Sequence, residues 1–144
     1  MGGTSDSGGS RGDELWLRGL KALGGAVVAN LVLYTGGTAL LDIPSEFPPL
    51  VAPFPAVFFT LIGTAGAVAT FAVIRRVSKR PEHVFTWIAA AVLVLSFLPD
   101  IWLLSDGAAE AFPGGTVPGV VLLMLMHVAA AAVIVRFLTG SARE

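Results

Sequence analysis

Four long uncharged apolar stretches occupy most of this chain and restrict its fold more than any other feature. They cover 22–41, 47–74, 84–99 and 111–135, and the third resumes after Asp100. A helix needs about 20 residues to cross a hydrocarbon core of ~30 Å, because each residue advances it by ~1.5 Å. Only 13% of the residues are charged, about half the share in soluble domains. The sequence therefore predicts an all-α integral membrane protein.

Prolines and polar flanks set the expected helix boundaries. Proline suits a first helical turn and disrupts an interior, so the second helix is expected to begin near Pro55 and the fourth near Pro118. The expected spans are about 17–41, 54–75, 83–104 and 117–138, within one transmembrane domain of 15–138. The Gly/Ser-rich residues 1–14 are predicted to be a disordered tail, and 139–144 a short tail. A cleaved signal peptide is the alternative for the first span, but its apolar region is about twice a typical signal core.

The basic residues predict the orientation. All nine lie at the same side of the expected spans: Arg11, Arg18, Lys21, Arg75, Arg76, Lys79, Arg80, Arg136 and Arg143. The opposite loops carry acidic residues and neither Lys nor Arg. Because loops rich in Lys and Arg stay in the cytoplasm, we expect an up-down-up-down four-helix bundle with both termini and both tails cytoplasmic. The expected location is the plasma membrane of a prokaryote, as a multi-pass protein.

Four polar residues inside the expected spans form the candidate site: Asn30, Thr64, Asp100 and His127. Polar side chains are costly in lipid and normally face the protein interior. Asn30 is nine residues beyond Lys21, and His127 is nine residues before Arg136. Both are thus roughly 13 Å above the basic boundary, which predicts an Asn30–His127 hydrogen bond. Asp100, counted from Glu82, comes out roughly 14 Å higher than His127, too far for a direct pair.

The candidate site has two interpretations. Its polar groups can be interhelical contacts that fix register, or a proton-responsive or ligand-binding site built on His127, since imidazole titrates near neutral pH. Haem ligation is disfavoured, because the other histidine, His83, lies at the inner boundary. The sequence has no cysteine and no recognisable catalytic motif. We therefore predict no catalytic residue, no metal site and no cofactor.

Small residues and prolines predict two further features. Pairs such as Gly25 with Ala29 and Gly63 with Ala67 allow helices to approach closely, either inside the bundle or between copies of the chain. The outer connection 42–55 contains five prolines, which make it stiff and extended. It is expected to be a rigid turn or a lid over an outward pocket.

Three short segments resemble an uncharacterised family of small four-span bacterial and archaeal membrane proteins. They are Asn30-Leu31-Val32-Leu33-Tyr34, Leu95-Ser96-Phe97-Leu98-Pro99-Asp100 and Met126-His127-Val128-Ala129-Ala130. The resemblance covers roughly 15–138. It implies the same four-helix architecture and no known activity.

These observations favour a non-enzymatic membrane protein, either an accessory subunit or one that binds a protein partner or lipid within the bilayer. The expected partners are the lipid bilayer and another membrane protein or a second copy of the chain, and no nucleic acid. The alternative is a small oligomeric transporter or channel subunit, with Asn30, Thr64 and His127 along a polar path and Asp100 at its outer mouth. An intramembrane enzyme or redox protein is the least favoured class.

Overall fold

The computed structural model describes residues 7–140, which form five helices and no strand. In chain order the helices are α1 (Ser7–Leu40), α2 (Pro53–Val77), α3 (Pro81–Trp102), α4 (Asp106–Ala109) and α5 (Val117–Thr139). Within this part of the chain, four helices are long and apolar enough to cross a membrane: Gly12–Leu40 of α1, and α2, α3 and α5 over their whole lengths. The predicted all-helical class is confirmed. Four such helices are the pattern of a multi-pass membrane protein.

Proline defines the first turn of three of these helices. α2, α3 and α5 each have a proline at the first or second helical position, where the missing backbone N–H would have no partner in any case. At the start of α5, the Thr116 hydroxyl accepts a hydrogen bond from the Gly119 backbone N–H. These starts lie within two residues of those expected from the sequence.

α1 begins earlier than the sequence predicted. Residues 7–14, assigned to a disordered tail, continue the helix, because extending an existing helix adds one hydrogen bond for each residue fixed. The Arg18 guanidinium, through Nη1, donates to the Leu138 carbonyl at 3.4 Å and holds this end of α1 against α5. With 34 residues, α1 is about 51 Å long, more than a bilayer core requires. The rest of the predicted N-terminal tail (1–6) and positions 141–144 of the C-terminal tail lie outside the described residues.

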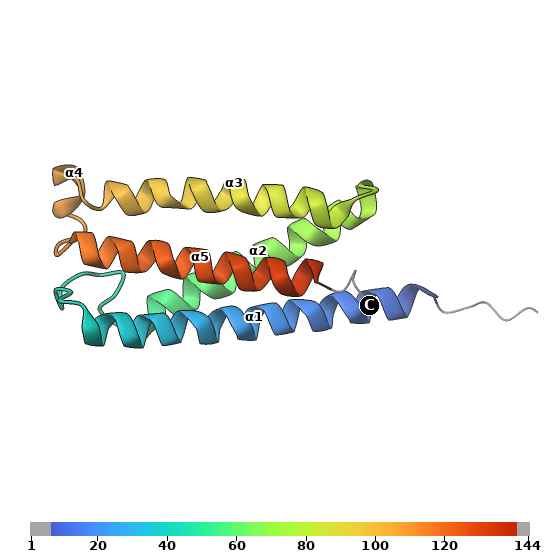
Figure 1. Ribbon diagram of the computed structural model, residues 1–144, viewed down its shortest axis with the longest axis horizontal. Coiled ribbons are helices and arrows are strands. Elements are labelled where there is room, and N and C mark those ends of the chain that lie inside the picture. The colour runs from blue at the N-terminus through green and yellow to red at the C-terminus, as the bar shows by residue number, and fades with distance from the viewer. Residues whose placement is uncertain (1–6, 141–144) are drawn as a thin grey trace, which may run out of the picture.

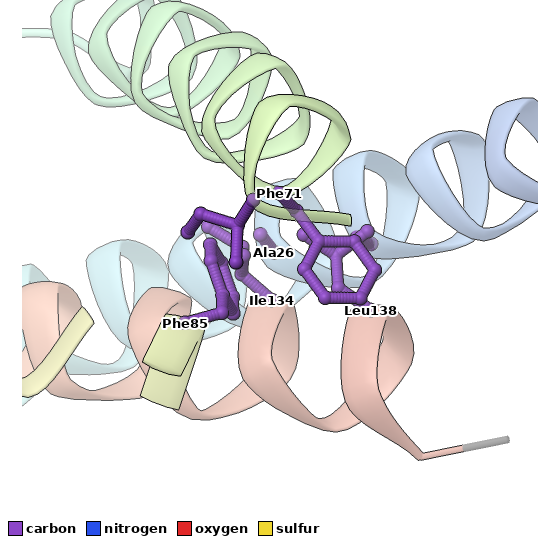
Figure 2. Close-up of a cluster of buried hydrophobic side chains, with 7 residues drawn as sticks. Ala26, Phe71, Phe85, Ile134 and Leu138 are labelled. Carbon is purple, nitrogen blue, oxygen red and sulfur yellow. The ribbon is translucent and has the colours of Figure 1, made fainter. Parts of the chain in front are cut away.

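The four long helices meet in an apolar cluster near one end of the molecule. Figure 2 shows Ala26 of α1, Phe71 of α2, Phe85 of α3, and Ile134 and Leu138 of α5 gathered in this cluster. The Phe71 and Phe85 rings lie edge to face with centroids 5.1 Å apart. We call this group, completed by Ala22 and Ile74, the basal cluster. It is where all four helices are held together.

A second cluster closes the opposite end. Phe47 and Leu50, from the proline-rich connection between α1 and α2, are buried against Leu122 and Met126 of α5. The Tyr34 hydroxyl of α1 donates to the Leu50 carbonyl at 3.3 Å. The connection therefore packs into the end of the helices as a folded plug. We call these four buried side chains the loop cluster.

Connections that carry acidic residues lie together at the loop-cluster end. An ideal Cβ on Gly114, which has a φ of +76°, would lie 3.1 Å from side-chain atoms of Pro44 and Glu46. The segments around 41–52 and 103–116 thus touch each other. Figure 1 shows both at the same end, whereas the short turn between α2 and α3 lies at the other end. Arg75 and Arg76 end α2 beside this turn, and Arg136 lies in the last turn of α5.

The outward faces of the helices are apolar. Large exposed side chains include Val32 of α1, Val73 of α2, Val94 of α3 and Val121 of α5. The buried interior is also mainly apolar, and its polar members are Asn30, Thr60, Thr64 and Asp100. Apolar surface on the outside is what a hydrocarbon solvent favours, because lipid does not penalise its exposure.

Candidate functional site: a groove between α2, α3 and α5

A groove of about 840 Å³ lies between α2, α3 and α5. α2 and α3 touch at the basal cluster through Phe71 and Phe85. Towards the loop cluster they separate, since α2 crosses to pack along α1 while α3 stays beside α5 (Figure 1). The groove occupies this separation. Its size falls within the range of about 300–1,000 Å³ typical of ligand pockets.

Glycines form part of the α2 wall of the groove. Gly63 and Gly66 both line it, and an ideal Cβ on either would meet nothing within 4 Å. Gly25 on α1 is different, because its Cβ would lie 2.9 Å from Val133 and 3.0 Å from Phe137 of α5. Close packing inside the molecule therefore accounts for Gly25. Gly63 and Gly66 of α2, in contrast, border the open space of the groove.

All four residues of the sequence-based candidate site line this one groove. Asn30, Thr64 and Asp100 are buried, with 6%, 1% and 5% of their surface exposed, and His127 is half-exposed. Asn30 reaches the groove from α1, Thr64 from α2, Asp100 from α3 and His127 from α5. The helices thus bring together four polar groups that are far apart in the sequence. Whether they serve a function stays a prediction.

Asn30 pairs with Thr60, and not with His127 as the sequence predicted. Asn30 Nδ2 donates to Thr60 Oγ1 at 2.8 Å, and the Thr60 hydroxyl donates to the Ala56 carbonyl at 2.6 Å. Because the hydroxyl proton is used on Ala56, Thr60 Oγ1 accepts from Asn30, which fixes the orientation of the amide. The counting argument gave only the depth of Asn30 in the membrane. The Asn30 side chain points from α1 towards α2, where it meets Thr60, instead of towards α5.

Asp100 and His127 are in contact, which corrects the predicted 14 Å separation. His127 Nδ1 lies 3.1 Å from Asp100 Oδ2. The predicted depths of Asp100 and His127 were counted from Glu82 and Arg136, on the assumption that these two residues lie at the same depth in the membrane. They do not, because α3 begins beyond the end of α5 (Figure 1). Side chains also lean towards the N-terminus of their own helix. Asp100 and His127 therefore lean towards each other.

The Asp100–His127 contact is a close approach without an aligned hydrogen bond. His127 Nδ1 is also 2.9 Å from the Leu123 carbonyl oxygen. That oxygen only accepts, so Nδ1 carries a proton and donates it along α5. Asp100 Oδ2 is buried and receives no aligned donor. The contact thus joins α3 and α5 and leaves one carboxylate oxygen unsatisfied.

Sequence reasoning missed Thr60, which belongs to the same polar group. It is buried, lines the groove and lies one turn before Thr64, whose hydroxyl donates to the Thr60 carbonyl at 2.8 Å. The spacing of four residues was visible in the sequence and indicated a shared helix face. Among the residues that the structure describes, no group of three or more His, Cys, Asp or Glu could hold a metal ion.

The family described as "Family of unknown function (DUF6069)" matches residues 10–144. The chain belongs to this family. The expected membership of a family of small membrane proteins without a known activity is confirmed, and the DUF6069 match extends slightly beyond the 15–138 anticipated. No curated protein matches the chain, and no solved structure does. The DUF6069 assignment leaves the groove as the main guide to function.

Proposed function

We propose that this protein is a non-enzymatic membrane protein, an accessory or binding subunit, whose groove holds a lipid-like molecule within the bilayer. The observation that carries this proposal is the groove itself, which opens between α2 and α3, has an apolar lining and contains a few buried polar groups. Such a combination is typical of small-molecule sites. The Thr60 and Thr64 hydroxyls both donate to backbone carbonyls of their own helix, so neither supplies a hydrogen-bond donor to the groove.

The proposal includes a membrane orientation. The four long helices cross the plasma membrane of a prokaryote in up-down-up-down order, as a four-helix bundle with both termini in the cytoplasm. Support comes from the gathering of Arg75, Arg76 and Arg136 at the basal end, because positively charged ends stay in the cytoplasm. The mouth of the groove then faces the acyl chains of the bilayer.

Filling the groove tests the binding function. Gly66→Leu places a large side chain into open space on the α2 wall, and Gly24→Leu does the same on α1, where an added Cβ also meets nothing within 4 Å. Gly24 does not line the groove, so it is the matched control. Both variants and the wild type are placed in lipid nanodiscs, and native mass spectrometry counts the lipid-like molecules retained. We expect Gly66→Leu to retain fewer molecules; equal retention in all three proteins would contradict the proposal.

A second candidate function is transport by an oligomer of this chain. The observation that favours it is that the ionisable pair Asp100–His127 lines the same groove as the Thr60 and Thr64 hydroxyls. Intramembrane ionisable groups often mark ion or proton paths. Proteoliposomes carrying a pH-sensitive dye test this function. Proton flux that disappears in Asp100→Asn supports transport, and the absence of flux in the wild type rejects it.

A further inference from the structure

Two fully buried oxygen atoms of residues that line the groove receive no aligned hydrogen bond from the protein. They are Asn30 Oδ1 and Asp100 Oδ2. Both residues are more than nine-tenths buried and both line the groove. A buried acceptor without a donor is costly, and the cost is larger for a charged carboxylate. Two acceptors beside the groove therefore lack an aligned donor, although His127 Nδ1 lies 3.1 Å from one of them, Asp100 Oδ2.

The orientation of each group follows from its other contacts. Asn30 Nδ2 is committed to Thr60, so its amide presents the oxygen as the free atom. His127 Nδ1 directs its proton to the Leu123 carbonyl, so it does not satisfy Asp100 Oδ2. The polar side chains that contact Asn30 and Asp100, Thr60 and His127, thus both donate to backbone carbonyls. What both free atoms require is an N–H or O–H group from outside the protein.

We infer that the occupant of the groove is an amphiphile from the bilayer whose small head donates hydrogen bonds to Asp100 and Asn30, while its apolar chain lies along α2 and α3. This inference rests on the proposed binding function and specifies its ligand. A primary ammonium and a hydroxyl both supply the required donors. Bulk phosphatidylcholine does not, because its choline nitrogen and its phosphate diester carry no N–H or O–H group.

A series of heads on one chain length tests the inference. The wild-type protein is placed in phosphatidylcholine nanodiscs and given dodecylamine, 1-dodecanol, dodecyltrimethylammonium or dodecyl methyl ether, and native mass spectrometry measures the bound fraction. The first two have donors, whereas the third has charge without a donor and the fourth has neither. We expect the amine and the alcohol to bind at least about fivefold better than the other two, as one or two hydrogen bonds imply. The amine and alcohol arms separate an ammonium ligand from a hydroxyl ligand.

Matched variants locate the acceptors. Asn30→Leu and Thr60→Val both break the Asn30–Thr60 bond, but only Asn30→Leu removes the free oxygen. Asp100→Leu and His127→Leu both break the Asp100–His127 contact, but only Asp100→Leu removes the free carboxylate. We expect the preference for donor heads to be lost in Asn30→Leu and Asp100→Leu and kept in His127→Leu. In Thr60→Val it is expected to fall by less than in Asn30→Leu, because the released Asn30 amide can turn but keeps its oxygen. Because each pair disturbs the same contact, a general loss of folding affects both members and is distinguished from loss of an acceptor.

The outcomes separate this inference from the function on which it rests. If all four heads bind equally and Gly66→Leu blocks all of them, the groove binds apolar chains only and the inference about the head is wrong. If dodecyltrimethylammonium binds as well as dodecylamine, charge rather than hydrogen-bond donation selects the head, which also overturns the inference. If Gly66→Leu leaves all binding unchanged, the proposed function itself fails.

Discussion

His127 Nδ1 on α5 lies 3.1 Å from Asp100 Oδ2 on α3, beside a groove where α3 has already separated from α2. The contact therefore joins α3 to the rest of the molecule at a level where α2 offers it no support. Closer to the basal cluster, Phe85 supplies the apolar attachment of the same helix. Phe85 and Asp100 are thus two attachment points of α3.

The first prediction concerns the coupling between Asp100 and His127. A double-mutant cycle with Asp100→Asn, His127→Gln and the double variant is expected to give an interaction free energy of about 0.5–3 kcal/mol, as for residues in contact. The measurement is the free energy of unfolding in lipid bicelles. A control cycle pairs His127→Gln with Thr86→Val, whose hydroxyl bonds within α3 to Glu82 near the other end of that helix. Equal, near-zero values in both cycles would show that the contact contributes nothing.

The second prediction concerns the hydrogen bond between α1 and α2. Thr60→Val removes the partner of Asn30 and is expected to destabilise the protein by about 0.6–1.7 kcal/mol, the range measured for interhelical bonds in membranes. Thr64→Val is the matched control, because the Thr64 hydroxyl bonds only to its own helix. Unfolding measured under the same conditions should rank Thr60→Val below Thr64→Val. The reverse order would remove this bond from the account of helix packing.

The third prediction compares neighbouring glycines on α1. Gly25→Ala brings a methyl group to 2.9 Å from Val133 and 3.0 Å from Phe137, so α1 and α5 must move apart at a cost of about 1–3 kcal/mol. Gly24→Ala meets open space and is expected to be neutral or to stabilise the helix by up to about 1 kcal/mol. Thermal unfolding of the two variants checks the difference. Similar transition temperatures would mean that α1 and α5 do not pack as described.

The fourth prediction concerns the plug formed by the proline-rich connection. Phe47 is fully buried in the loop cluster, and its ring lies against Gly119. Phe47→Ala should cost about 3–5 kcal/mol, as for other buried phenylalanines. Phe54→Ala is the control, because the Phe54 side chain is exposed. Limited proteolysis within this connection should be faster only in Phe47→Ala; no difference between the variants would argue that the connection does not pack into the helices.

The fifth prediction concerns orientation. The native chain has no cysteine, so single cysteines can be introduced without a background. Ser78→Cys lies in the turn between α2 and α3, and Ser45→Cys lies in the connection between α1 and α2. In intact cells, a membrane-impermeant thiol reagent should label Ser45→Cys and spare Ser78→Cys until the membrane is opened. Labelling of Ser78→Cys alone would reverse the proposed orientation.

Much of the helical architecture could be predicted because lipid imposes a simple rule on composition. Uncharged stretches of membrane length gave α2, α3 and α5 closely, and prolines gave their starts, because both signals depend on local chemistry. The start of α1 was missed because a Gly/Ser-rich segment has a weak intrinsic helix preference, whereas extension of the helix that follows it needs no new nucleus.

The membership of the candidate site was easier to predict than its pairing. Asn30, Thr64, Asp100 and His127 stood out because polar groups are rare inside apolar spans, and all four do line one groove. Their partners depend on helix rotation and on the relative level of helix ends. Residue counting includes neither of these quantities. It therefore paired Asn30 with the wrong helix and separated Asp100 from His127.

The divergence of α2 from α3 determines how the groove would be supplied. Its opening lies along the flanks of two apolar helices, so a proposed occupant enters by lateral diffusion within the leaflet. Occupancy then follows the mole fraction of the amphiphile among the lipids instead of its aqueous concentration. A molecule that partitions strongly into the bilayer can fill the groove even where each contact with it is weak. Titrations against dissolved ligand measure that partition together with binding, and only titrations at a fixed lipid ratio separate the two.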